Sequence, residues 1–293
     1  MNQILFQIVL FISRLPLRIL YLFSDFLFFI NYNIIGYRKK VIFNNLKNSF
    51  PEKNDKEIRK IAKKFYLNFS DYIVELLKSF TISAEELHQR VEHVNLDVFF
   101  KAKKEGKNVM MLSGHIFNWE WFNAMATLIP QEKSFPIYRK VENDFWEEKI
   151  RLIRGSYGNE AIEAETVMKH ILRNPNDGNS VYMFVADQTP MRSQVNYGIE
   201  FLHQKTPIFV GYDRIASRMN VAFVYCEMEK IARGKYRATY HEILPDAEKF
   251  VPLEVVKKFH HLLENTINRN PDNWLWSHKR WKYQDAIKQF EQD

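Results

Sequence analysis

A histidine and a glutamate lie five positions apart in a segment with the composition of a strand, a turn and a helix. Residues 108–120 read N-V-M-M-L-S-G-H-I-F-N-W-E. The apolar beginning predicts a strand over 108–112, Ser113-Gly114 predicts a turn, and His115 opens the next element. Catalytic groups in α/β proteins gather at such carboxyl ends of strands. This segment therefore carries the best candidates for chemistry in the chain.

His115 and Glu120 together have the side chains needed to activate a hydroxyl group. Five positions on an ideal helix do not share a face, so the two meet only if His115 lies in the turn and Glu120 reaches back to it. The carboxylate then accepts the proton of one ring nitrogen and leaves the other nitrogen to take a proton from a hydroxyl. A capping histidine beside an unrelated glutamate of the first helical turn has the same spacing, so both interpretations stay open at this point.

Helical and strand patterns alternate along the chain. Residues 55–80 carry apolar side chains at a helical period, and Ser83 with the acidic residues after it predicts the start of a short helix. Further strands are predicted over 91–94, 134–138, 161–164, 181–186, 199–202, 221–229 and 236–243, and further helices over 96–104, 117–128, 144–157, 165–173, 208–219 and 254–268. This alternation predicts an α/β fold in which a mixed sheet is flanked by helices.

Composition limits the class of protein. Of the 293 residues, 46% are hydrophobic and 26% are charged, which is typical of a globular chain and excludes a disordered or polytopic membrane protein. The single cysteine, Cys226, excludes an internal disulfide and zinc motifs built from cysteine pairs. The pair His260-His261 lies on a polar helical stretch and matches no motif of metal ligands, so no metal site is predicted.

The first 37 residues are strongly hydrophobic. Residues 4–37 consist mainly of Leu, Ile, Phe, Tyr and Val, broken by Arg14, Arg18 and Asp25. A clean membrane-spanning helix takes about 18 or more apolar residues, a length that 19–37 reaches only if Asp25 is tolerated. We expect residues 1–37 to form membrane-anchoring helices, either spanning or lying in the interface; the alternative is a pair of buried core helices.

A basic stretch follows the oily segment. Between Arg38 and Lys64 the chain has ten basic and three acidic residues. Such a stretch binds an anionic membrane surface or nucleic acid, and its position directly after an oily segment favours the membrane. Basic residues after an anchor also indicate the cytoplasmic side. We therefore expect an anchor over 1–37 and one catalytic domain over 38–293 at the cytoplasmic face of the membrane.

The H-x4-[DE] pattern resembles a motif of glycerolipid and lipid A acyltransferases. Other segments resemble the lipid A branch and occur in matching order: Gly36-Tyr37-Arg38-Lys39-Lys40-Val41, Asn45-Leu46, Phe50-Pro51-Glu52, Tyr138-Arg139, Arg154-Gly155, Ala186-Asp187-Gln188, and N-P-D-N-W-L-W-S-H-K-R-W-K from residue 270. The chain thus resembles, over about residues 5–283, the lauroyl/myristoyl-type lipid A biosynthesis acyltransferases of the lysophospholipid acyltransferase-like superfamily.

The resemblance implies an activity and a site. The enzyme would move a fatty acyl chain from acyl-ACP or acyl-CoA, as co-substrate, to a hydroxyl of a lipid A precursor or related glycolipid, with no further cofactor. His115 would be the general base and Glu120 would orient it. Arg154 and Asp187 would bind substrate, Arg154 through a phosphate or the thioester oxyanion, and Arg139 is a further candidate for the acceptor phosphate.

The resemblance further implies a bacterial inner-membrane protein, with acyl carrier protein or a CoA thioester, a lipid acceptor and the membrane as partners and no nucleic acid. Trp274, Trp276 and Trp281 are expected to be core aromatics. The same architecture serves lysophospholipid, aminolipid and aryl-pigment acceptors, which are the alternative substrates. The alternative of another class is a non-enzymatic protein that binds anionic membranes, which explains residues 1–64 but not the order of the site residues.

Overall fold

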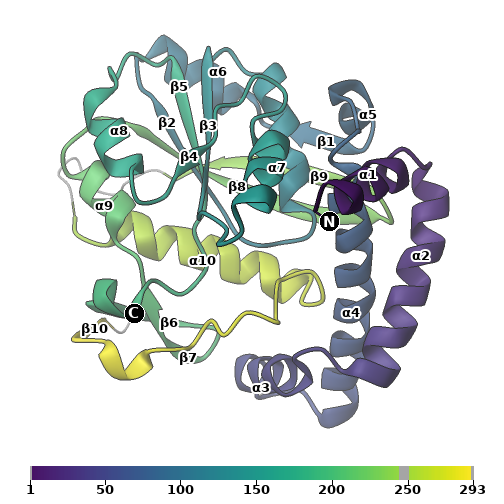
Figure 1. The fold of residues 1–293 in the computed structure, drawn as a ribbon. Coiled ribbons are helices and arrows are strands. Elements are labelled where there is room, and N and C mark those ends of the chain that lie inside the picture. Colours follow the sequence, from purple (N-terminus) through teal and green to yellow (C-terminus); the bar gives the residue numbers. More distant parts are fainter. Residues whose placement is uncertain (1, 244–250, 292–293) are drawn as a thin grey trace.

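The computed structural model describes residues 2–243 and 251–291, so the first residue of the predicted anchor, residues 244–250 and residues 292–293 lie outside it. Its centre is a seven-stranded sheet in the order β1-β9-β8-β2-β5-β3-β4 (Figure 1). The strands are β1 (Val91–Val94), β2 (Val109–Ser113), β3 (Lys133–Tyr138), β4 (Ile162–Glu163), β5 (Ser180–Val185), β8 (Ala222–Ala232) and β9 (Lys235–Glu242).

The sheet is mixed. β8 and β9 are antiparallel, whereas the other neighbouring strands run parallel. Every residue of β2 and all but the last residue of β5 are buried, as expected of central parallel strands covered by helices on both faces. The predicted α/β fold with a mixed sheet is confirmed.

Helices cover this sheet and connect its strands. They are α5 (Ala84–His88), α6 (Asp97–Lys104), the 3₁₀ helix η2 (Trp119–Thr127), α7 (Asp144–Arg154), α8 (Val167–Arg173), α9 (Gly211–Ala216) and α10 (Glu254–Arg269). α10 contacts β8 and also β6, so it lies between the main sheet and a smaller sheet (Figure 1). The smaller sheet consists of β6 (Tyr197–Phe201), β7 (Gln204–Ile208) and β10 (Gln289–Glu291), and two short 3₁₀ helices, η3 (Arg192–Gln194) and η4 (Gln284–Ala286), accompany it.

Two predicted helices differ from the structure. The helix expected over 117–128 is the 3₁₀ helix η2, and the helix expected over 208–219 is only the short α9, preceded by the unexpected strand β7. β6 and β7 form a hairpin whose two turn residues, Leu202 and His203, both have positive φ. Gly or Asn usually marks such a turn, so the sequence carried no hairpin signal here.

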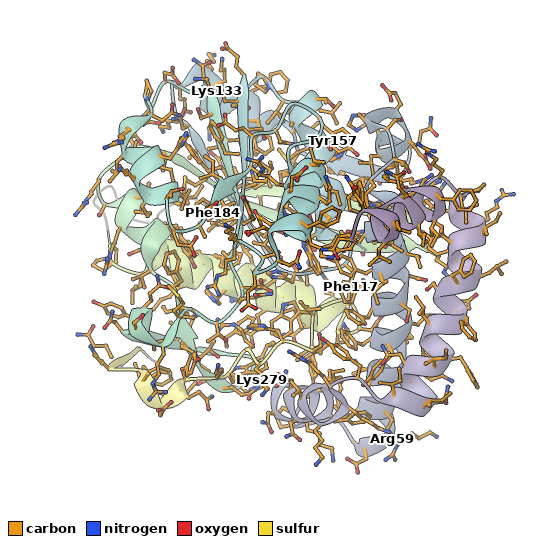
Figure 2. The ribbon with its side chains drawn as sticks, in the orientation of Figure 1. Arg59, Phe117, Lys133, Tyr157, Phe184 and Lys279 are labelled. Atoms are coloured by element: carbon orange, nitrogen blue, oxygen red, sulfur yellow. The ribbon has the colours of Figure 1, made fainter. Side chains whose placement is uncertain are left out.

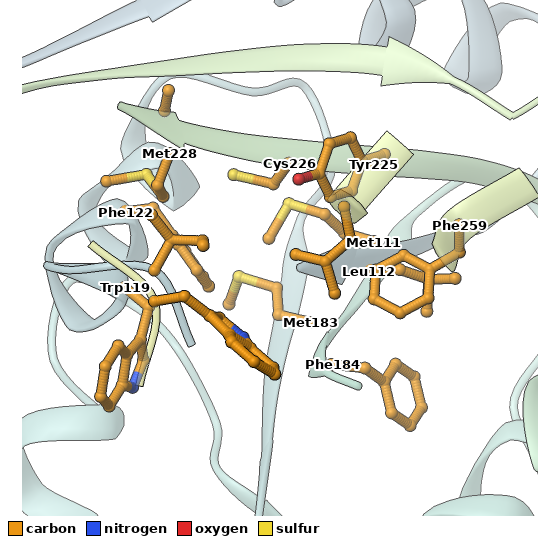
Figure 3. Close-up of a cluster of buried hydrophobic side chains, with 14 of the residues drawn as sticks. Met111, Leu112, Trp119, Phe122, Met183, Phe184, Tyr225, Cys226, Met228 and Phe259 are labelled. Carbon is orange, nitrogen blue, oxygen red and sulfur yellow. The ribbon is translucent and has the colours of Figure 1, made fainter. Parts of the chain in front are cut away.

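The core of the main sheet is built from the apolar runs of three neighbouring strands. Figure 3 shows their side chains packed together, with Met111 and Leu112 from β2, Met183 and Phe184 from β5, and Tyr225, Cys226 and Met228 from β8. Burial raises the pKa of the Cys226 thiol far above its ordinary value, so this cysteine stays protonated. Cys226 is therefore a core residue rather than a nucleophile.

The N-terminal part of the chain is helical and packs against one long helix. Its elements are α1 (Asn2–Ser13), α2 (Leu17–Ile30), the π-helical turn η1 (Asn31–Ile35), α3 (Lys39–Ser49) and α4 (Asp55–Lys78). α1, α2 and α3 all contact α4, and α2 runs alongside it (Figure 1). The predicted helix over 55–80 is thus the support on which the N-terminal helices pack.

α2 has one face docked on α4, partly through hydrogen bonds, and one open apolar face. Tyr21 donates a hydrogen bond to Glu75 (2.7 Å) and Ser24 donates one to Asp71 (2.7 Å), both on α4. Together with η1 it forms a helix over Leu17–Ile35 that is long and apolar enough to cross a membrane by length and composition. Its exposed apolar side chains are Ile19, Leu22, Phe23, Phe26, Leu27 and Phe29. The alternative of two buried core helices is therefore wrong, and the division into domains 1–37 and 38–293 stays a prediction.

The basic segment after α2 holds the C-terminal stretch of the chain. Asn45 of α3 donates hydrogen bonds to the carbonyl oxygens of Trp276 (2.8 Å) and His278 (2.9 Å). Arg38 donates to the carbonyl oxygen of Ser277 (2.8 Å). Two segments with family-like motifs are thus joined although they lie more than 200 positions apart in sequence. Side chains of the first segment donate hydrogen bonds to backbone carbonyl groups of the second.

Asn45→Ala should lower the free energy of unfolding by about 1–3 kcal/mol, because it leaves two carbonyl groups without their donor. The adjacent, exposed Asn44 is the matched control, and Asn44→Ala should change the stability by less than about 0.5 kcal/mol. Denaturant unfolding of both variants measures the difference. Equal stability of the two variants would show that the α3 contact does not hold the C-terminal stretch.

Candidate active site

The neighbouring strands β2 and β5 bring two site residues together. The strands are parallel, with Ser113 opposite Val185, and the N–H of Ala186 donates to the carbonyl of Ser113 (2.8 Å). His115 and Asp187 each lie two positions beyond these paired strand ends. Their meeting at one edge of the sheet follows from strand register, as is usual for ligand sites in α/β folds.

Asp187 is a buried carboxylate that accepts three hydrogen bonds. Its Oδ1 accepts from Nδ1 of His115 (2.5 Å), and its Oδ2 accepts from the backbone N–H of His115 (2.9 Å) and from Nε1 of Trp274 (2.6 Å). Burial alone would raise the pKa of Asp187, but the electrostatic interaction with the His115 ring and these hydrogen bonds hold that pKa well below its ordinary value. Asp187 therefore stays ionised and orients the imidazole.

The second ring nitrogen of His115 faces the cavity side. Because Asp187 accepts from Nδ1, Nε2 carries the lone pair, and the side-chain amide of Gln188 donates to it (2.9 Å). The ring also lies edge-on to Trp119, with 4.8 Å between centroids, and its side chain is 16% exposed. A neutral imidazole with an ionised carboxylate behind it and an accessible Nε2 can act as a general base.

Glu120 does not make the contact with His115 that its spacing suggested. Its Oε1 accepts a hydrogen bond from the guanidinium of Arg154 (3.3 Å), at the end of α7. The guanidinium also lies 5.4 Å from the centroid of the Tyr138 ring. Glu120 lies in the 3₁₀ helix η2, after the turn that carries His115. Asp187 follows β5, the strand beside β2, and its carboxylate is the one that contacts the imidazole.

A cavity of about 330 Å³ connects these groups. Its polar lining includes the predicted site residues His115, Glu120, Arg139 and Arg154, and Asp187 lies buried behind His115. The rest of the lining is largely apolar and includes Phe122, Pro136, Ile137, Met183, Phe184, Val185 and Phe209. Figure 3 shows Phe122, Met183 and Phe184 in the same apolar cluster. A few polar groups in an apolar hollow of this size suit an amphipathic ligand.

The loop between β2 and η2, which carries His115 and is called the site loop below, is hydrogen-bonded to α4. The side chain of Asn118 donates to Glu75 (3.0 Å) and accepts from the backbone N–H of Glu120 (3.1 Å). Glu75 is fully buried and also accepts from Tyr21 and Tyr236; burial raises its pKa in spite of these donors. A chain of hydrogen bonds therefore joins α2 to the backbone of Glu120.

Phe117 fastens the same loop through apolar contacts. Figure 2 shows it beside α4, and its ring packs against Phe65 and Tyr72, with centroid distances of 5.8 and 5.4 Å. The helix that supports α2 on one side thus also supports the site loop.

Sequence reasoning missed three residues that support the site. Trp274 was expected to be only a core aromatic; it is buried and also donates to Asp187. Its place in the family-like stretch was the available signal. Glu75 and Asn118 occur at no recognisable motif spacing, because their hydrogen bond joins elements 43 positions apart.

His115, which follows a strand of the main sheet, and Arg154, at the end of α7, thus line one largely apolar cavity. Comparison with protein families identifies the class of protein. The chain belongs to the bacterial lipid A biosynthesis acyltransferase family, whose model matches residues 3–283. The resemblance noted in the motifs is thereby confirmed, and the protein is an acyltransferase. A search of curated proteins gave no match.

The stability that Asp187 contributes should depend on pH. Its folded pKa is depressed, so its contribution is complete above the unfolded value of about 3.9 and is lost as the pH falls towards the folded value. We expect the difference in unfolding free energy between the wild type and Asp187→Asn to be largest near neutral pH and to shrink below about pH 4. A difference that stays constant across this range, in chemical denaturation, would mean that folding does not lower the pKa of Asp187.

Proposed function

We propose that the protein transfers a fatty acyl chain from the thioester of acyl-ACP or acyl-CoA to a hydroxyl of a lipid A precursor or related glycolipid. The observation that supports this most is the His115–Asp187 pair, whose Nε2 lies beside a largely apolar cavity. The family supplies the acyltransferase chemistry. The geometry fits O-acyl transfer in particular because it offers a neutral base for a hydroxyl.

His115 acts as the base in one displacement. Nε2 takes the proton from the acceptor hydroxyl as its oxygen attacks the thioester carbonyl carbon. Collapse of the adduct breaks the C–S bond, and the leaving thiolate takes the proton from His115. Asp187 keeps Nδ1 protonated and stabilises the imidazolium that forms in between. The amide of Gln188 now donates to Nε2, and the acceptor hydroxyl takes that place when it binds.

Arg154 stabilises negative charge on the substrate. Glu120 and the face of Tyr138 hold its guanidinium in place, and its remaining N–H groups are available for the thioester oxyanion or a phosphate. Glu120 thus acts as the positioning residue for Arg154. Arg139, exposed at the end of β3, binds the phosphate of the acceptor.

We infer that the enzyme lies in the membrane interface, at the cytoplasmic face of the bacterial inner membrane, and the open apolar faces of α1 and α2 support this position. α1 exposes Ile4, Leu5, Ile8 and Phe11, and α2 adds its own exposed apolar face. A spanning α2 would carry α4, with the buried carboxyl groups of Asp71 and Glu75, into the hydrocarbon, where charge is costly. An interfacial position keeps α4 out of the hydrocarbon and buries the open apolar faces of α1 and α2.

Acyl transfer by the purified full-length protein tests the function. Acyl-ACP and acyl-CoA are each offered with a lipid A precursor, a lysophospholipid, an aminolipid and an aryl alcohol, and the products are identified by mass spectrometry. We expect an ester product from the lipid A precursor. Transfer only to one of the other acceptors would move the enzyme to that substrate class, and failure with every pair would refute the proposal.

His115→Ala should lower the turnover number by roughly 10²–10⁴-fold, because the base is lost and Asp187 cannot reach the hydroxyl from behind it. The control is His261→Ala, at an exposed position of α10, which should keep wild-type activity. Turnover and circular dichroism are measured for both. Wild-type turnover in the His115 variant would refute the role of this residue as base.

Arg154→Lys should reduce turnover by roughly 10–100-fold with little change in the thermal midpoint, since a lysine cannot reproduce the paired donors of a guanidinium. Arg151, exposed on the same helix, is the matched control, and Arg151→Lys should leave turnover unchanged. If both lysine variants were fully active, Arg154 would be an ordinary residue of the helix surface.

A further inference from the structure

A second hollow, away from the active site, lies where α1 turns into α2. It measures about 770 Å³, and the turn between the two helices, α4, α5 and the β8–β9 turn contribute to its walls. Its charged lining contains five cations and one carboxylate: Arg14, Arg18, Lys78, Arg90, Arg233 and Glu86. The proposed acyl transfer uses none of them.

Two of these cations already have partners. Arg90 pairs with Glu86 (2.9 Å), and Arg233 pairs with Asp71 (2.6 Å) and Asp25 (2.6 Å). These pairs build the wall of the hollow and add little net charge to it. The attraction for an anion therefore comes from the remaining three.

Lys78 is the decisive one. The residue is buried, with 7% exposed, yet among the described residues its ammonium makes a single hydrogen bond, to the carbonyl oxygen of Leu15 (3.3 Å). Within the described residues, no carboxylate lies at ion-pair distance from Lys78, Arg14 or Arg18. Buried cations are normally paired, because desolvation without a partner is costly. An ammonium with unused donors beside a hollow indicates an anionic ligand.

The surroundings indicate which anion. Arg14 and Arg18 are exposed at the mouth of the hollow, one turn beyond Phe11 and beside Ile19, whose apolar side chains are open to solvent. The hollow offers guanidinium and ammonium groups, and exposed apolar side chains lie close to its arginines in sequence. A phosphodiester with attached acyl chains satisfies both, with the phosphate bound by the paired donors of arginine.

We propose that this hollow binds the phosphate headgroup of an anionic membrane phospholipid, with Lys78 at its base and Arg14 and Arg18 at its mouth. Such a site holds the α1–α2 turn at the level of the lipid phosphates while the apolar faces of both helices enter the membrane. The site is separate from the acceptor site, and its test measures binding rather than acyl transfer.

The test titrates the full-length protein, in nonionic detergent, with short-chain phosphatidylglycerol, short-chain phosphatidylcholine or inorganic phosphate. We expect saturable binding of phosphatidylglycerol and weaker binding of the other two. Phosphatidylglycerol binding that does not saturate would refute the site. Inorganic phosphate binding as tightly as phosphatidylglycerol would refute its assignment to a lipid.

A pair of double variants separates a site from diffuse attraction. Arg14→Gln with Arg18→Gln removes two cations at the turn from α1 into α2, and Lys39→Gln with Lys40→Gln removes two exposed cations beyond the end of α2. If the attraction is diffuse, removing each cation in either pair should lower the affinity for phosphatidylglycerol about fivefold. The site predicts a loss at least about tenfold larger for the arginine pair, because charge-assisted hydrogen bonds are lost as well. Equal losses would refute the site.

Lys78→Met tests the base of the hollow. Methionine has a similar shape but no charge, so phosphatidylglycerol binding should weaken at least about tenfold. The thermal midpoint without lipid should stay at or above that of the wild type, because a buried ammonium without a carboxylate is removed. A lower midpoint with unchanged lipid binding would make Lys78 a structural residue and contradict the proposal.

Discussion

The buried carboxylate of Asp187 is the group on which the site depends. An ionised carboxylate out of contact with water must be fully hydrogen-bonded, and here the ring and backbone of His115 and the indole of Trp274 supply the donors. Trp274 belongs to the C-terminal stretch, which α3 holds through Asn45. One charge just beyond β5 therefore connects His115, which we propose as the base, to the C-terminal stretch and to α3.

Local pattern predicted most of the fold, because the strands of the main sheet are short apolar runs and α4 and α10 have long helical periods. The motifs that resemble the family gave five candidate site residues, and four of them line one cavity. The partner of His115 was not predictable in this way. Spacing along the chain indicated Glu120, whereas the hydrogen bond goes to Asp187, 72 positions away. That contact depends on β2 lying beside β5, and strand order is not a property of any short segment.

The contacts of the apolar N-terminal segment were also not predictable from the sequence. Composition indicates an oily segment with an occasional charge, but the roles of its few polar residues follow only from what they face. Tyr21, Ser24 and Asp25 lie on the side of α2 that meets α4 and Arg233, so they join the helix to the catalytic part. The opposite side is open. Glu75 continues this contact to Asn118, and the helix that we place at the membrane is thereby connected to the site loop.

Nuclear magnetic resonance of the His115 imidazole tests the central claim most directly. The structure places the Nδ1 proton in a short hydrogen bond to Asp187, and such a proton gives a resonance far downfield. A resonance that is absent from His115→Gln, and so assigned to this ring, should disappear in Asp187→Asn and persist in Glu120→Gln. Persistence in Asp187→Asn together with loss in Glu120→Gln would contradict the account, because Glu120 would then be the carboxylate that orients the base.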